Sequence, residues 1–198
     1  MAYRLSRFIL LLLCKLFFRI EFKGREFIPE TGGFILVSNH FSYLDPIAVG
    51  TACPRSVSFM AKNTLFNYPV LSGWLKAVNV IPVRRGSADL SAIRKALSNA
   101  KSGNGLALFP EGTRRTKETA FVDPEPGAGF LADKLNVPVI PAFVSGTEVA
   151  LPRGTRRLCL AKVKVVFGKE IHIERGKPYH EISEMIMANI KNLANENN

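Results

Sequence analysis

The stretch FILVSNHFSYLDP, residues 34–46, decides the fold class of this chain. Its first six residues form a mostly apolar run after Gly32-Gly33, which is typical of a buried β-strand. Asp45-Pro46 has the pattern of a helix start, with the aspartate as N-cap and the proline at the first helical position. A strand that passes through a short polar turn into a helix is one unit of an α/β sheet.

The same alternation continues through the chain. Apolar patterns predict further strands at residues 56–61, 78–83, 105–110, 137–146 and 158–168. Helical spacing predicts helices at residues 68–78, 87–103, 128–136 and 179–198. No linker or repeat divides the 198 residues. We therefore expect one α/β domain over residues 26–198, with a mostly parallel or mixed sheet flanked by helices, after an N-terminal helical segment at 1–25.

The composition limits the class of protein. Hydrophobic residues make up 47% of the chain and charged residues 22%, which excludes a disordered protein. The formal net charge of +11 favours an anionic partner, which could be nucleic acid, an anionic membrane or a phosphorylated substrate. Cys14, Cys53 and Cys159 lie far apart and form no metal-binding pattern or disulfide framework, so we predict no metal site and a reducing cytosol.

Residues 3–25 indicate which anionic partner to favour. The uninterrupted apolar run, residues 8–14, is far shorter than the about 20 residues that span a bilayer. On a helix the basic residues share one face and apolar side chains cover much of the rest, as in a helix that lies in a membrane interface. The predicted anchoring residues are Arg4, Arg7, Leu12, Leu13, Lys15, Leu16, Phe17 and Arg19. The alternative is a helix packed on the protein's own core with a solvated basic edge.

Two ionisable residues that could carry chemistry follow predicted strands. His40 follows residues 34–39 and Glu111 follows residues 105–110, so both would lie at the carboxyl ends of strands, where α/β folds bind ligands. Asp45 could orient His40 as a general base. The alternative is that Asp45 only caps its helix and His40 is a satisfied core residue, and the HxxxxD spacing alone favours that alternative.

A second group of residues offers cations at strand ends. FPEGTRR, residues 109–115, presents backbone N–H groups, a hydroxyl and two guanidiniums, and arginine matches phosphate oxygens in a bidentate fork. VIPVRRG, residues 80–86, and Lys62 repeat this theme. Singly, each of these cations could be a solvated surface residue. The GAGFLA stretch, residues 127–132, imitates a dinucleotide fingerprint but does not follow a strand, so we interpret it as a helix start with small residues for close packing.

With these pieces placed, the chain resembles the glycerolipid acyltransferase family, and within it the bacterial 1-acylglycerol-3-phosphate acyltransferases. The resemblance rests on four ordered blocks: NHFSYLD (39–45), VIPVRRG (80–86), FPEGTRR (109–115) and VPVIPAF (137–143). It implies transfer of a fatty acyl chain from an acyl thioester to the sn-2 hydroxyl of 1-acylglycerol-3-phosphate, which gives phosphatidic acid. The implied base is His40, oriented by Asp45. The implied substrate-binding residues are Lys62, Arg84 or Arg85, Glu111, Gly112, Thr113 and Arg114.

The resemblance also implies partners and a location. The acyl donor would be acyl-CoA or an acyl carrier protein, the acceptor a lysophospholipid, and no metal or redox cofactor is implied. The protein would lie peripherally or monotopically on the cytosolic side of the cytoplasmic membrane. Two other functions remain open: the same chemistry on another acceptor, such as a lyso-ornithine lipid or glycerol-3-phosphate, and a non-catalytic protein that binds anionic membranes. No known nucleic-acid-binding module is found in the sequence.

Overall fold

Seven strands form one mixed sheet in the computed structural model, which describes residues 2–84, 89–155 and 157–197. The strands are β1 (Glu21–Lys23), β2 (Phe34–Ser38), β3 (Val57–Lys62), β4 (Ile81–Val83), β5 (Gly105–Leu108), β6 (Val139–Ser145) and β7 (Lys164–Phe167). Their order across the sheet is β1-β7-β6-β2-β5-β3-β4. All neighbouring pairs are parallel except β6 and β7, so the predicted mostly parallel or mixed sheet is confirmed.

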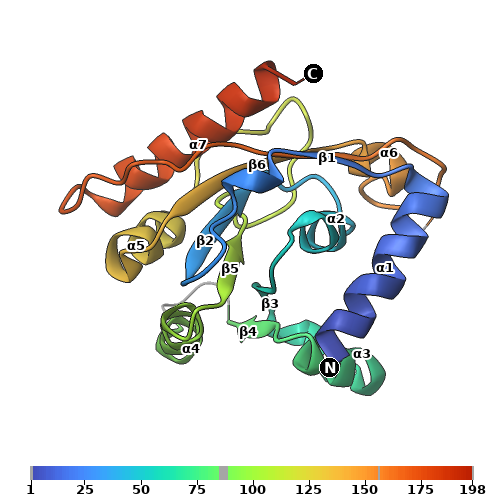
Figure 1. Ribbon diagram of the computed structural model, residues 1–198, viewed down its shortest axis with the longest axis horizontal. Helices are drawn as coiled ribbons and strands as arrows, with labels where there is room; N and C mark the ends of the chain where they lie inside the picture. The colour runs from blue at the N-terminus through green and yellow to red at the C-terminus, as the bar shows by residue number, and fades with distance from the viewer. Residues whose placement is uncertain (1, 85–88, 156, 198) are drawn as a thin grey trace.

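Helices cover both faces of this sheet, as expected for an α/β fold (Figure 1). The helices are α1 (Ala2–Phe18), η1 (Arg25–Phe27), α2 (Asp45–Ala52), η2 (Asn63–Asn67), α3 (Pro69–Ala77), α4 (Leu90–Lys101), α5 (Pro126–Leu135), α6 (Thr147–Ala150) and α7 (Tyr179–Asn195). One core cluster joins α1 and α2 to the sheet, and a second cluster joins α4, α5 and α7 to its other face. The central strand β2 is buried along its whole length, which explains why its sequence is almost continuously apolar.

The small residues of the GAGFLA stretch pack α5 against α7. A side chain at Gly129 would place its Cβ 2.0 Å from the carbonyl oxygen of Tyr179, so only glycine fits there. The N–H of Gly129 also donates to the hydroxyl of Ser183 on α7, at 2.9 Å. The interpretation of these small residues as part of a close-packed helix start is confirmed.

The segment at residues 158–168 differs from its prediction. Only Lys164–Phe167 forms a strand, so the strand predicted over residues 158–168 is wrong in its length, and three of these four residues are buried. β7 lies between β1 and β6 and not at the edge of the sheet, because residues 21–23 pair with it in parallel. Residues 21–23 form β1, although they belong to the helical segment predicted over residues 1–25. The helix α1 therefore ends earlier than expected, at Phe18.

The N-terminal helix packs on the protein and also exposes apolar side chains. Cys14 is buried in the first core cluster, with Leu11 and Phe18 packed beside it. Arg7 was predicted on the basic face, but it is half-buried and its guanidinium donates to the carbonyl of Thr51 on α2, at 3.3 Å. Arg19 lies beyond the end of α1 with a φ of 41°, which is left-handed backbone and does not continue the helix.

Candidate active site

His40 and Asp45 form a hydrogen-bonded pair immediately after β2. The imidazole Nδ1 lies 2.8 Å from Oδ2 of Asp45. Because the carboxylate accepts, Nδ1 carries the proton in the neutral ring and Nε2 keeps its lone pair. The Asp45 side chain is fully buried, whereas 13% of the His40 side chain is exposed. The pair therefore has the arrangement of a base held by an inner carboxylate.

The Asp45 carboxylate is held by four donors. Its Oδ2 also accepts the backbone N–H groups of Phe41 and Ser42, at 2.6 and 2.7 Å. Its Oδ1 accepts the hydroxyl of Thr147, which lies at the start of α6. The predicted N-cap is wrong, because Leu44 holds the cap position and Asp45 is the first residue of α2. The carboxylate turns back toward the turn at 40–42 and so reaches the imidazole.

The His40 ring lies flat against the aromatic side chain of Phe109, the residue that follows β5. Its centroid is 4.2 Å from that of Phe109, with 20° between the ring planes. Phe59 of β3 stacks in turn on Phe109, with 6.0 Å between the two ring centroids. Packing of this kind fixes the ring in one orientation, so Nε2 stays in one place relative to any bound substrate.

Glu111 lies behind His40 and not in the position expected of an acceptor contact. Only 1% of the residue is exposed. Its Oε2 accepts the backbone N–H of His40 at 2.7 Å, and its Oε1 accepts that of Phe121 at 3.1 Å. Burial raises the pKa of the Glu111 carboxyl above its usual range, and the two N–H groups offset part of this rise. The structure therefore favours a positioning role for Glu111.

The rest of the FPEGTRR block forms a tight turn at the same edge of the sheet. Gly112 has a φ of 62°, a conformation that disfavours other residues, and its N–H donates to the carbonyl of Phe109. Thr113 is exposed, and Arg114 places its guanidinium carbon 3.5 Å from the ring centroid of Tyr43. The N–H of Arg115 donates to the carbonyl of His40 at 2.7 Å. The block thus binds both backbone polar groups of His40, which brings the first and third motifs together as predicted.

The other predicted cations follow the neighbouring strands at this edge. Lys62 ends β3 and is exposed, and it pairs in register with Val83 at the end of β4. Arg84 follows directly, with 72% of its side chain exposed and its Nε 3.7 Å from Oδ2 of Asp89. The choice between Arg84 and Arg85 is not tested, because Arg85 lies outside the described residues.

Two residues of the site were not singled out from the sequence. The amide of Asn39 bonds both polar groups of Val144, at 2.8 and 2.9 Å, and so extends the pairing of β2 and β6 up to His40. Thr147 holds Asp45 from α6. Both follow the ends of buried strands, which is the rule that selected His40 and Glu111, so this rule could have found them. Within the part of the chain that the structure describes, no group of His, Cys, Asp and Glu could hold a metal ion.

Comparison with known proteins agrees with this site. The family model for acyltransferases matches residues 19–145, which include the His40–Asp45 pair and the FPEGTRR block. The chain belongs to the acyltransferase family. In this acyltransferase the matched region runs from just after α1 to the end of β6, so it contains the six strands β1 to β6.

Individual relatives carry more specific names. The acyltransferase is 26% identical over 154 residues to the 1-acyl-sn-glycerol-3-phosphate acyltransferase of Bacillus subtilis, covering 77% of this chain and 74% of that one. It is 29% identical over 160 residues to the chloroplastic LPAT1 enzyme of that name from Arabidopsis thaliana, covering 79% of this chain but only 44% of the relative. The crystal structure of the 1-acyl-sn-glycerophosphate acyltransferase of Thermotoga maritima has the same fold, with a TM-score of 0.74, 22% identity, and coverage of 96% of this chain and 82% of that one.

Proposed function

We propose that this acyltransferase transfers a fatty acyl chain from an acyl thioester to the sn-2 hydroxyl of 1-acylglycerol-3-phosphate, giving phosphatidic acid. The observation that carries the proposal is the 2.8 Å bond from Nδ1 of His40 to Asp45, which leaves Nε2 free to accept a proton. The names of the relatives from Bacillus subtilis and Arabidopsis thaliana support 1-acylglycerol-3-phosphate as the acceptor.

The proposed mechanism is direct transfer. Nε2 of His40 removes the proton of the sn-2 hydroxyl as its oxygen attacks the thioester carbon, and the imidazolium is stabilised by Asp45. The tetrahedral intermediate expels the thiolate, which takes the proton back from Nε2. Positioned general-base catalysis of this kind contributes about 10²- to 10⁴-fold. The proposal includes no acyl-enzyme, so trapping of a covalent acyl-protein during turnover would contradict it.

The acceptor phosphate is proposed to lie among the cations at the carboxyl edge of the sheet. Arg114 is held in place by its stacking on Tyr43, so its planar fork is already oriented. Lys62 and Arg84 follow the next two strands and are exposed. Holding two substrates in line can supply roughly 7–11 kcal/mol of the barrier, and binding of the acceptor phosphate by these cations would contribute to that orientation. The donor would be acyl-CoA or an acyl carrier protein.

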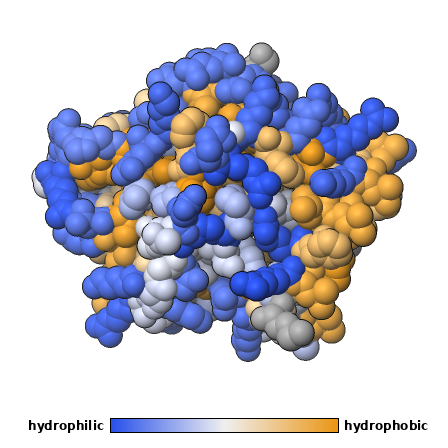
Figure 2. Space-filling model, in the orientation of Figure 1, coloured by the Kyte–Doolittle hydropathy of each residue, from blue (hydrophilic) through white to orange (hydrophobic). Residues whose placement is uncertain are grey.

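Membrane association is proposed through α1 and α3. Seven large apolar side chains of α1 are exposed: Leu5, Phe8, Ile9, Leu12, Leu13, Leu16 and Phe17. On α3, Val70 is 90% exposed, and the indole of Trp74 donates to the hydroxyl of Ser6 on α1, which joins the two helices. Figure 2 shows this surface as a continuous apolar strip along the side where α1 lies. Arg4 and Lys15 are exposed and border this apolar strip, where their positive charges would lie near lipid phosphates.

The structure limits how this surface could meet a bilayer. Among the residues that it describes, no helix is long and apolar enough to cross a membrane. The proposal is therefore a peripheral or monotopic enzyme at the cytosolic face of the cytoplasmic membrane. Both substrates of the proposed reaction carry acyl chains, so an enzyme on the membrane surface reaches its acceptor without extracting it far into water.

The test is acyl transfer by the purified protein in detergent. Wild type, His40→Ala and Asp45→Asn are compared with His180→Ala, a change at an exposed histidine on α7. We expect phosphatidic acid from lysophosphatidic acid and acyl-CoA, a loss of about 10²- to 10⁴-fold in the first two variants, and full activity in the third. Equal activity of folded His40→Ala and wild type would exclude His40 as the base. A panel of acceptors, including glycerol-3-phosphate and lyso-ornithine lipid, decides the acceptor.

A further inference from the structure

A basic cavity lies at the amino-terminal ends of the strands, opposite the end of the sheet where His40 lies. It has a volume of about 650 Å³ and lies between the first turns of α1 and the loops that precede β3 and β5. Ser56 and Asn104 line it immediately before those strands, whereas His40 follows the carboxyl end of β2. A strand of five or six residues is roughly 15–20 Å long, so this cavity, here called the α1 cavity, is separate from the candidate active site.

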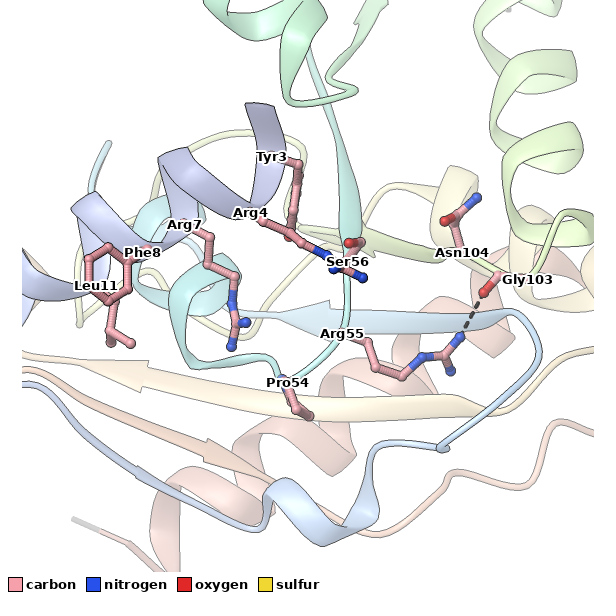
Figure 3. A pocket seen from close by; sticks show the side chains of 10 residues that line it. All are labelled: Tyr3, Arg4, Arg7, Phe8, Leu11, Pro54, Arg55, Ser56, Gly103 and Asn104. Atoms are coloured by element: carbon pink, nitrogen blue, oxygen red, sulfur yellow. Dashed lines mark hydrogen bonds between the residues drawn. The ribbon is translucent and has the colours of Figure 1, made fainter. Parts of the chain in front are cut away.

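The α1 cavity contains positive charge without a matching carboxylate. Arg4 and Arg7 line it from α1, and Arg55 from the loop after α2; none of the ten described residues that line it is acidic. Figure 3 shows Arg4 reaching from α1 toward Ser56, with Arg7 and Arg55 on either side of Pro54. Within the described residues, no salt bridge joins any of these arginines to a carboxylate.

The three arginines differ in how many of their guanidinium N–H groups already donate to protein carbonyls. Arg55 is committed to the protein, because its guanidinium donates to the carbonyls of Pro29, Thr31, Gly32 and Gly103. Arg7 makes only a long bond to Thr51, and its Nε is buried with no hydrogen-bond partner. Arg4 is exposed at the rim. Arg4 and Arg7 line the cavity without a carboxylate partner among the described residues, so an anion with several oxygen acceptors complements their charge.

The open side of the cavity continues onto apolar surface. Phe8 lines the cavity and is also 66% exposed, and Leu12 lies one turn further along α1, 59% exposed. A soluble anion would gain nothing from this continuation. An anionic group attached to acyl chains fits both parts, because its oxygens meet the guanidiniums while its chains cover the exposed side chains.

We propose that the α1 cavity binds the phosphate group of an anionic membrane phospholipid, whose acyl chains lie along α1 from Phe8 toward Leu12. The inference rests on the proposed membrane association of α1, and not on acyl transfer. A lipid in this position would orient the helix in the interface, and with it the opposite edge of the sheet where His40 lies.

The test uses the full chain and vesicles of phosphatidylcholine, with and without phosphatidylglycerol. Arg4→Gln/Arg7→Gln is compared with Lys15→Gln/Arg19→Gln, which removes the same charge from the same segment but away from the cavity. We expect the first pair to lose at least about tenfold more of the preference for phosphatidylglycerol, because oriented forks bind phosphate more strongly than diffuse charge. Equal losses in the two double variants would show unspecific attraction and would overturn the proposal.

Two further variants keep the test independent of folding. Ser56→Trp fills the cavity without changing the charge, and Arg4→Gln alone leaves the bond from Arg7 to Thr51 in place. Both are expected to lose the phosphatidylglycerol preference and to keep binding to phosphatidylcholine. A Ser56→Trp protein with an unchanged preference would overturn the proposal.

Inorganic phosphate alone, measured by calorimetry, distinguishes the two sources of a phosphate group. Tight binding that Ser56→Trp abolishes, without any lipid preference in wild type, would assign the cavity to a soluble phosphate compound and overturn the lipid proposal. Weak or no binding of inorganic phosphate together with a lipid preference supports it. The acyl-transfer assay in detergent needs no vesicle, so failure of the proposed function would appear there and not in these measurements.

Discussion

The backbone N–H of His40 donates to Oε2 of Glu111, 2.7 Å away, across 71 positions of sequence. The same carboxylate accepts the N–H of Phe121, so one buried side chain fixes two segments of the site. Arg115 completes the arrangement by donating its N–H to the carbonyl of His40. The peptide that carries His40 is therefore held from both sides by the FPEGTRR block.

Glu111→Gln is expected to lower kcat and to leave the KM for both substrates nearly unchanged. A glutamine has one acceptor oxygen, so one of the two buried N–H groups loses its partner, which also costs about 1–3 kcal/mol of stability. Steady-state kinetics and chemical denaturation measure the two effects. Glu118→Gln, at an exposed position after the same block, is the control. A wild-type kcat in Glu111→Gln would show that the hydrogen bonds to the Glu111 carboxylate do not position His40.

Thr147→Val is expected to reduce kcat about tenfold, with KM kept. Valine has nearly the same shape but cannot donate to Oδ1 of Asp45, and a lost hydrogen bond to a charged group is worth about 1.5–3 kcal/mol. Thr147→Ser keeps the hydroxyl and should restore most of the activity. If serine and valine were equally impaired, the methyl packing of Thr147 and not its hydroxyl would matter.

Arg114→Gln is expected to raise the KM for lysophosphatidic acid by roughly 10- to 100-fold, because charge-assisted bonds to phosphate are lost. Transfer to monoacylglycerol, which has the same hydroxyl but no phosphate, should be equally slow in variant and wild type. Arg153→Gln, an exposed arginine after α6, is the control. A similar KM increase for both acceptors would argue against a phosphate contact.

Asp89→Asn is expected to lower the Tm at pH 7 by more than it does at pH 3. The N–H of Arg84, the hydroxyl of Ser91 and the N–H of Ala92 hold the pKa of the Asp89 carboxyl well below its usual range. In the unfolded chain the group binds a proton near pH 3.9, about the usual aspartate value. The charged form therefore stabilises the fold above that pH, and this stabilisation is lost as the pH falls toward the folded pKa.

Thermal melts of wild type and Asp89→Asn across this range measure the change. Glu30→Gln, which alters an exposed carboxylate between η1 and β2, is the matched control. Its difference in Tm from wild type should not become smaller between pH 7 and pH 3. A difference in Tm that stays constant from pH 7 to pH 3 would mean that the charge of Asp89 is not what stabilises the start of α4.

Local patterns in the sequence determined the layers of this protein and the neighbourhood of its site. Apolar runs of strand length and amphipathic runs of helical length predicted most elements, because a strand or helix must bury one face whatever the rest of the chain does. His40 and Glu111 were expected at the same edge for a similar reason, since parallel strands end on one side of a sheet. Their hydrogen bond confirms this.

Only the tertiary structure decided which atoms meet. The contact of Thr147 with Asp45 spans 102 positions, and the Glu111 carboxylate accepts backbone N–H groups from two separate segments, at His40 and Phe121, so neither contact follows from local pattern. The hydrogen bond from Arg7 to Thr51 and the pairing of residues 21–23 with β7 could not be predicted from local pattern either. Periodicity fixes which face of an element is apolar, but the partners of each polar group depend on how distant elements pack.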